Sequence, residues 1–343
     1  MVVVFFLIGT LMGCEELGIK PQAGDAPPQM ATPAPEAPVM PMPQPAPVPV
    51  APVLTPEQIV AEIQAKVAGQ ITNADLVKLA ESVPANSAVV ELNLQGTLVT
   101  AEGLSQLARL PQLRVVNLSN CPVPASDWAA ISGATQLESL DVSGSTLTDA
   151  SIAAIGEMVN LKALNISRTG VTDMGFSYLV KLSKLETILA GDLQINGSGF
   201  EAFTPKFAGA SLKEINVNKT GFGANGYQHI DGMKSLEVLI ASSSGTMDAG
   251  MQTLKGMKNL RVLSLRTNGV TDQGLKQLTC WDTLEIVDLS DNRLVSDFSL
   301  GKLKKRKQLK SLNLQGTACT PAKVQDLKET IPDCKIRFMD VEL

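Results

Sequence analysis

An aliphatic pattern recurs along most of this chain. Its form is L-x-x-L-x-L, where L is an aliphatic residue, replaced by Ala at two places, and x is any residue. The pattern begins at ten positions: Val89, Leu113, Leu137, Leu161, Leu185, Leu212, Leu236, Leu260, Leu284 and Leu309. Successive positions lie 24 residues apart, except for one spacing of 27 and one of 25. Such a constant period indicates an internal repeat, in which stacked units bury one continuous core.

Each unit is predicted to contain a strand, a polar turn and a helix. The alternation within x-L-x-L predicts a short strand with its two aliphatic side chains on one face. A small polar residue or cysteine follows in nine units, at Thr97, Cys121, Ser145, Thr169, Thr220, Ser244, Asn268, Asn292 and Thr317. We expect these side chains to form a ladder that bonds to backbone groups of the turns. Helices are then expected at pairs such as Thr172-Asp173 and Thr271-Asp272, since Thr suits the N-cap and Asp the first turn.

With its leucine spacing and its T-D-x-G helix starts, as in Thr172-Asp173-Met174-Gly175, residues 89–335 resemble the leucine-rich-repeat family. The resemblance is to bacterial, ribonuclease-inhibitor-like repeats. It implies an α/β solenoid, or horseshoe, with a parallel β-sheet on the concave face and helices on the convex face.

Helical and capping segments are expected on both sides of the repeats. Thr55-Pro56-Glu57 begins an amphipathic segment in the order expected of an N-cap followed by proline at the first helical position. We therefore divide this part of the chain into a helical N-terminal cap (55–86), ten repeats (87–318) and a C-terminal cap (319–343). The C-terminal cap is expected to contain a helix from Pro321 and a closing strand at 336–338.

The amino-terminal end suggests export and lipid attachment. Residues 2–12 are apolar, which is too short for a membrane-spanning helix but suits a signal peptide over residues 1–13. Leu11-Met12-Gly13-Cys14 resembles the bacterial lipobox, which implies a lipoprotein anchored to the membrane by acyl chains on Cys14. The alternative is a buried strand that happens to end in Gly-Cys. The lipobox implies a location in the bacterial cell envelope with the repeats outside the cytoplasm, and Glu15 favours the outer membrane.

Residues 14–54 are predicted to be a disordered tether. Twelve of the twenty prolines fall between Pro21 and Pro52, and the segment carries little charge and no helical or strand period. Proline at this density favours the polyproline II conformation and prevents a packed core. A docking site for a proline-binding module is the alternative interpretation.

Composition argues against several functions. The net charge of -5 offers no basic face for nucleic acid, so no nucleic acid is expected as a partner. The single histidine, His229, removes the usual general base and metal ligand, so we expect no enzyme, cofactor or metal. Recurrent aspartates at helix starts, such as Asp149 and Asp248, are better explained by their position in the repeat than by calcium binding.

The five cysteines match no zinc pattern. If Cys14 is lipidated, four remain, and a disulfide between Cys319 and Cys334 would fasten the last turn. Sequence alone does not give the geometry that such a bridge needs.

The predicted binding surface is the concave sheet. Its candidate residues follow the central aliphatic residue of each strand, with one arginine two positions further on: Asn93, Asn117, Asp141, Asn165, Leu189, Asn216, Ile240, Arg266, Asp288 and Asn313. Exposed aliphatic residues among polar ones, here Leu189 and Ile240, are a plausible contact for an unknown protein ligand. Sheet propensity without any partner is the alternative interpretation of this surface.

The predicted function is a monomeric, membrane-anchored scaffold that binds protein without catalysis. The alternative is an envelope structural protein or a binder of glycan or peptidoglycan.

Two further features have alternative interpretations. Aromatic residues gather between Phe176 and Tyr227, and they are interpreted either as core filler or as a functional insertion. Basic residues gather between Lys302 and Lys310, and they are interpreted either as a solvated helix end or as a contact for anionic groups.

Overall fold

The computed structural model describes residues 55–66, 69–82, 89–204, 212–278, 280–339 and 341–343. The chain divides into two units, residues 1–52 and 53–343, and every described element belongs to the second. The predictions for the signal peptide, for Cys14 and for the tether therefore lie outside the described residues.

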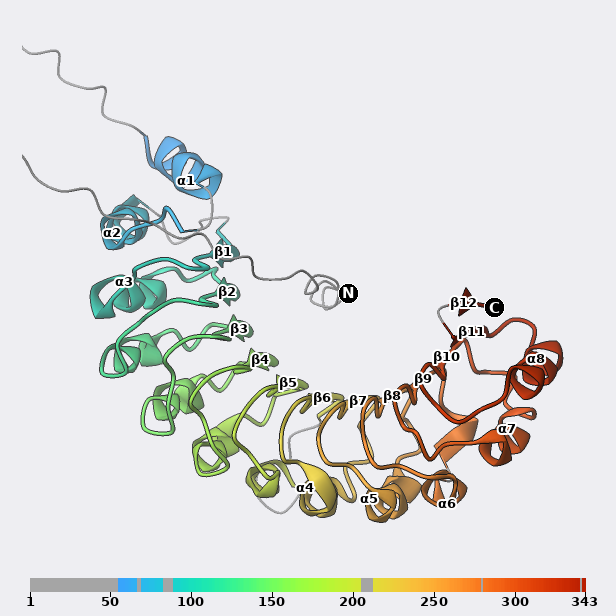
Figure 1. Cartoon of the computed structure of the whole chain (residues 1–343). Helices are drawn as coiled ribbons and strands as arrows, with labels where there is room; N and C mark the ends of the chain where they lie inside the picture. Colours follow the sequence, from blue (N-terminus) through green and yellow to red (C-terminus); the bar gives the residue numbers. More distant parts are fainter. Residues whose placement is uncertain (1–54, 67–68, 83–88, 205–211, 279, 340) are drawn as a thin grey trace, which may run out of the picture. The chain divides into compact units, whose positions relative to one another are not determined.

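The repeats form one sheet of twelve strands in chain order. The strands are β1 (Glu91–Asn93), β2 (Val115–Asn117), β3 (Ser139–Asp141), β4 (Ala163–Asn165), β5 (Thr187–Leu189), β6 (Glu214–Asn216), β7 (Val238–Ile240), β8 (Val262–Ser264), β9 (Ile286–Asp288), β10 (Ser311–Asn313), β11 (Lys335–Phe338) and β12 (Val341–Glu342). Neighbours pair in parallel up to β11, and β12 pairs antiparallel with β11. Within residues 53–343 the strands lie on the inner side of the curve and the helices on the outer side (Figure 1). The predicted α/β solenoid is confirmed.

The sheet register follows the aliphatic pattern. The central residue of each strand pairs with the central residue of the next, as Leu92 does with Val116 and Val116 with Leu140. These residues are buried, since alternation directs them into the core while their two neighbours point to the concave face. The closing strand expected at 336–338 is present as part of β11, whereas β12 was not predicted.

The convex side combines α-helices with 3-10 helices. The α-helices of the repeats and of the C-terminal end are α3 (Ala101–Gln106), α4 (Gly223–Ile230), α5 (Asp248–Thr253), α6 (Asp272–Gln277), α7 (Asp297–Leu303) and α8 (Pro321–Thr330). The 3-10 helices are η1 (Leu107–Arg109), η2 (Asp127–Gly133), η3 (Ile152–Glu157), η4 (Gly175–Lys181), η5 (Ser198–Phe203), η6 (Leu254–Gly256) and η7 (Cys280–Asp282). Because 3-10 helices have weaker hydrogen-bond geometry, those of the middle repeats depend on buried side chains such as Ile152 and Ile155.

Two helices precede the first strand, α1 (Pro56–Ala65) and α2 (Asn73–Ser82). Thr55 caps α1 as predicted, with Pro56 in the first turn and a reciprocal bond between Thr55 and Gln58. Ile63 of α1 and Leu76 and Leu79 of α2 are buried in the core. These helices therefore cover the apolar end of the repeats beside β1.

The turn after each strand of the ten repeats passes through the left-handed region. The second residue after the pattern has a positive φ in every repeat: Gly96, Asn120, Gly144, Arg168, Asp192, Lys219, Ser243, Thr267, Asp291 and Gly316. The following polar ladder is also present. Asn292, for example, donates to Leu265 O at 2.8 Å and to Leu289 O at 3.0 Å. The ladder is interrupted in the fifth repeat, where Leu193 is buried instead.

Aromatic side chains fill the core beneath the fifth and sixth repeats. Phe200 lies between Phe176, Phe203 and Phe222, at ring-centroid distances of 5.1, 6.1 and 5.5 Å. Tyr227 extends the cluster from Phe222, at 5.3 Å. All five are buried, which confirms the core-filler interpretation for them, whereas Tyr178 is exposed and Phe207 lies outside the described residues.

Among the described residues, no helix combines the length and apolarity needed to cross a membrane.

Candidate binding surface

Most of the predicted binding residues hold the turn of their own repeat. In seven strands the residue after the central aliphatic one accepts a hydrogen bond from the backbone N–H two positions later, at 2.8–3.2 Å: Asn93, Asn117, Asp141, Asn165, Asn216, Asp288 and Asn313. This Asx turn closes the strand before the left-handed residue. The recurrence of Asn and Asp in this column therefore has a structural cause, and one acceptor position of each side-chain oxygen is used by its own backbone.

The remaining predicted residues make no such turn. Leu189 and Ile240 are half-buried on the concave face and are separated by β6, where Asn216 lies between them. Arg266 follows β8, has a side chain that is 60% exposed, and pairs with Asp291 at 3.1 Å. The two aliphatic residues thus do not form one patch, and Arg266 is held at the rim of the face.

A second column on the concave face was missed at the sequence level. It consists of the residue before the central aliphatic one, which alternation directs to the same side of the sheet. In β7, β8 and β9 this residue is Val238, Val262 and Ile286, paired in register on consecutive strands. Ile286 is 43% exposed, and the other two are half-buried. Together with Ile240, these residues form what we call the aliphatic patch.

A row of alternating charges runs beside the sheet, one position earlier in every repeat except the first, which has Val90 there. It is formed by Arg114, Glu138, Lys162, Glu186, Lys213, Glu237, Arg261, Glu285 and Lys310, and we call it the charged row. Its ion pairs join neighbouring repeats, with Lys162–Glu138 at 2.7 Å, Arg261–Glu285 at 2.8 Å and Lys310–Glu285 at 2.6 Å. Hydrogen bonds from Arg261 and Lys310 lower the pKa of Glu285 to about 2. The charged row therefore compensates its own charge.

Glu214 is an unusual residue of the concave face. It occupies the same column as the aliphatic patch, on β6, between Thr187 and Val238. Burial raises the pKa of its carboxyl group, while a hydrogen bond with Thr187 opposes this shift in part. Glu214 forms no ion pair with any of the described residues. An acidic side chain thus lies at one end of the aliphatic patch.

The aspartates at the helix starts join successive repeats. Asp149 accepts from Thr172 N at 2.7 Å and from Thr172 Oγ1 at 2.6 Å, and Asp248 does the same with Thr271. A Cβ on Gly175 would come within 2.5 Å of Asp149 Oδ1, which explains the glycine of the T-D-x-G start. Within the described ranges, no group of three or more His, Cys, Asp or Glu residues could hold a metal ion.

The predicted disulfide is absent from the structure, where Cys319 and Cys334 are both free and buried. Cys319 Sγ faces Val295 O of the preceding repeat at 3.9 Å, whereas Cys334 Sγ faces Lys335 O at 3.7 Å. Each thiol therefore has its own environment, and the last turn is fastened by packing and by β11 and β12. Burial raises the pKa of Cys334 to about 11.

The basic cluster late in the repeats is largely paired. Lys304 contacts Asp326 at 2.6 Å, Arg306 pairs with Asp282, and Lys302 donates to Lys276 O at 2.8 Å. These contacts favour a structural role over a site for anionic groups.

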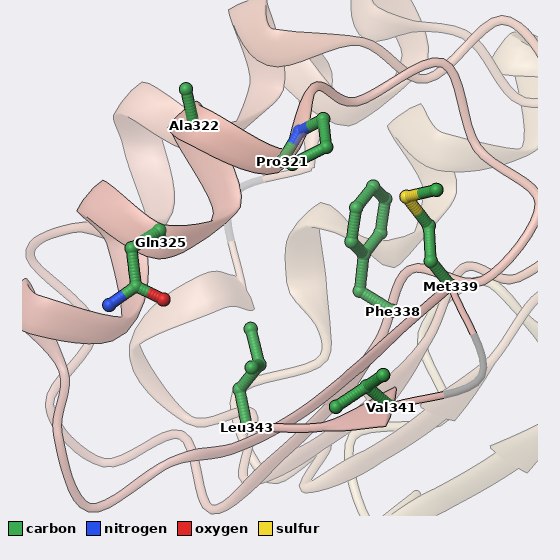
Figure 2. A pocket seen from close by; sticks show the side chains of 7 residues that line it. All are labelled: Pro321, Ala322, Gln325, Phe338, Met339, Val341 and Leu343. Carbon is green, nitrogen blue, oxygen red and sulfur yellow. The ribbon is translucent and has the colours of Figure 1, made fainter.

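An apolar groove of about 420 Å³ lies between α8 and the last two strands. Figure 2 shows Pro321, Ala322 and Gln325 on α8 along one side of the groove, Phe338 and Met339 on the other, and Val341 and Leu343 lower in the view. Its lining contains no ionisable side chain, so the groove offers no acid, base or nucleophile for catalysis.

Comparison with known proteins supports this fold. Residues 256–278 match the model of a leucine-rich-repeat family. No curated protein matches the chain. Among solved structures, an internalin from Listeria monocytogenes is 17% identical, with a TM-score of 0.54 over 82% of this chain and 93% of that one. An internalin C2 from the same organism is 24% identical over 63% of this chain and 83% of that one, with a TM-score of 0.46.

A leucine-rich-repeat protein of Leptospira interrogans is 14% identical over 77% of this chain and 74% of that one, with a TM-score of 0.46. The first internalin and the matched repeat confirm the predicted resemblance to leucine-rich-repeat proteins.

Proposed function

We propose that this chain is a non-catalytic scaffold that binds a protein partner on its concave face. The leucine-rich-repeat fold is typical of protein-binding scaffolds and is not typical of enzymes. The observation that carries the proposal is the aliphatic patch, in which Val238, Val262 and Ile286 lie side by side on an open sheet face. Exposed aliphatic side chains rimmed by charged and polar residues characterise surfaces that contact other proteins.

The second part of the proposal is the location. A lipid on Cys14 and the proline-rich tether would display the repeats from a bacterial envelope membrane, with the outer membrane favoured. The support is the lipobox-like Leu11-Met12-Gly13-Cys14 followed directly by the tether. Membrane fractionation of the full chain in a bacterial host tests this part. The wild type is expected in the membrane fraction, and Cys14→Ser is expected to leave it.

Glycan or peptidoglycan binding receives no specific support. That hypothesis relied on the concave amides, and each Asn of the Asx column directs its oxygen to its own backbone. Sugar rings also favour aromatic faces, whereas the described strand residues on the concave side of β1 to β10 include no aromatic side chain. A protein partner remains the better candidate.

The binding experiment uses the full chain as bait, after in-cell crosslinking. The double variant Val262→Asp, Ile286→Asp places two carboxylates on the aliphatic patch without disturbing buried residues. The matched control is Leu98→Asp, Met174→Asp, because these side chains are 78% and 76% exposed away from the concave strands. We expect a protein recovered by the wild type and the control but not by the patch variant. Equal recovery by all three baits would reject the concave patch as the binding site.

A further inference from the structure

The aliphatic patch and Glu214 form one continuous line across the sheet. Glu214, Val238, Val262 and Ile286 occupy equivalent positions on β6, β7, β8 and β9, as their register pairs show. With strands about 4.8 Å apart, the line extends for about 14 Å. A single segment of a partner protein can therefore cover all four side chains.

Glu214 differs from the other glutamates near it. Glu186 pairs with Lys213 at 2.9 Å, and Glu285 pairs with both Arg261 and Lys310. No such cation contacts Glu214 within the part of the chain that the structure describes. Its neighbour Lys213 is occupied by Glu186 in the charged row. Apart from its hydrogen bond with Thr187, the carboxyl group of Glu214 is thus available for a cation brought by a ligand.

Covering this carboxylate has a physical cost. A charge removed from water without a partner is strongly unfavourable, whereas a charge that gains a hydrogen-bonded ion pair is tolerated. A ligand that lies along the patch avoids this cost either by leaving Glu214 protonated, which its raised pKa assists, or by supplying a cation, and only the cation adds an attraction of its own. Ser311 on β10, the next position beyond Ile286 at the opposite end, carries no charge and makes no comparable demand.

We infer that the concave site, if it has the proposed binding function, recognises a protein segment in which a Lys or Arg precedes or follows a short run of aliphatic residues. The basic group pairs with Glu214, and the aliphatic side chains pack on Val238, Val262 and Ile286. Electrostatic complementarity of this kind selects the partner and fixes its direction along the sheet. An acidic or phosphorylated segment is disfavoured, because it would meet Glu214 with like charge.

The test is a selection from a phage-displayed library of random peptides against the folded full chain. We expect the selected peptides to share a basic residue beside two or three aliphatic ones, spaced so that the group spans about 14 Å. A selected peptide is then synthesised with its basic residue or with norleucine in its place. Both peptides are titrated against the wild type and Glu214→Gln. Glu138→Gln, which removes an acid from the charged row three repeats away and leaves the Glu186–Lys213 pair intact, is the matched control.

If Glu214 pairs with the peptide, the norleucine peptide and Glu214→Gln each weaken binding about tenfold, which corresponds to about 1.4 kcal/mol. Combining both changes should cause little further loss. Additive losses, or selected peptides without a basic residue, would overturn the inference. If Glu214→Gln does not change the affinity of the peptides but Ile286→Asp abolishes it, the inference is wrong and the proposed function is still supported. Peptides insensitive to both variants would contradict the proposed function itself. Circular dichroism spectra are recorded for every variant, so that a loss of binding is not confused with unfolding.

Discussion

The first four strands and strands β7 to β9 share one backbone but present different concave faces. In β1 to β4 the residues after the central aliphatic one are Asn93, Asn117, Asp141 and Asn165, and each closes its own Asx turn. In β7 and β8 the same position holds Ile240 and Ser264, and the column before it is aliphatic through β9. The first region uses its polar side chains to build the repeat. The second has side chains that the repeat does not need, and such residues are better indicators of a binding site.

The largest effect is expected at the junction between the two regions. Phe200 packs against three other phenylalanines beneath the fifth and sixth repeats. Phe200→Ala should lower the free energy of unfolding by about 3–5 kcal/mol, through lost burial and an unfilled cavity. Urea denaturation followed by circular dichroism measures this. Tyr178→Ala, at an exposed position of the same segment, is the control and should change little. Equal losses for both variants would show that the aromatic cluster does not hold the two regions together.

The polar ladder should contribute to stability in the aliphatic region without contributing to binding. Asn292→Ala removes one side-chain hydrogen bond from each of Leu265 O and Leu289 O, which keep Asn268 Nδ2 and Asn292 N, respectively, as donors. A loss of about 1–3 kcal/mol in the free energy of unfolding is expected. The adjacent, exposed Arg293→Ala serves as the control. If Asn292→Ala cost no more than this control, the ladder would have no structural role.

A smaller effect is expected from the Asx column of the polar region. Asn117→Ala removes the hydrogen bond that Asn117 Oδ1 accepts from Ser119 N. This should lower the free energy of unfolding by about 0.5–1.5 kcal/mol. Partner binding should be unchanged, in contrast to the loss expected for Val262→Asp. Parallel measurements of thermal unfolding and of binding by the two variants compare the regions directly. Reduced binding by a folded Asn117→Ala protein would remove the distinction between them.

The smallest effect concerns the charged row, which borders both regions. The pKa of Glu285 is lowered to about 2 and that of Glu138 is lowered by Lys162 and Arg114. Carboxyl groups with a lowered pKa in the folded state stabilise it above their unfolded pKa, near 4.3, and lose this contribution as the pH falls. We therefore expect the melting temperature to fall between about pH 4.5 and pH 2. Glu285→Gln should weaken this dependence, and an unchanged pH profile would contradict the role of the ion pairs.

The strands could be predicted because burial alone determines the leucine spacing. The helix capping at Thr55 and the ladder residues followed from backbone groups that must be satisfied. The column of Val238, Val262 and Ile286 is also present in the sequence, but the predicted binding surface placed its residues only after the central aliphatic one. The regular recurrence of Asn at that position was itself a sign of a structural role.

Other features depend on geometry that the sequence does not contain. A disulfide requires two cysteines at the right distance and orientation, and Cys319 and Cys334 instead each face a different carbonyl group. The 3-10 form of helices η2 to η5 and the ion pairs of Glu285 likewise arise only when neighbouring repeats are stacked.

The parallel register has a consequence for how the molecule folds and fails. Strands of the repeats pair only with strands one unit away in sequence, as Leu263 does with Leu239 and Val287. Stability is then a sum of nearest-neighbour couplings, and folding can begin in any repeat and propagate in both directions. Under a pulling force applied at the two ends, such a molecule unravels unit by unit from its weakest coupling.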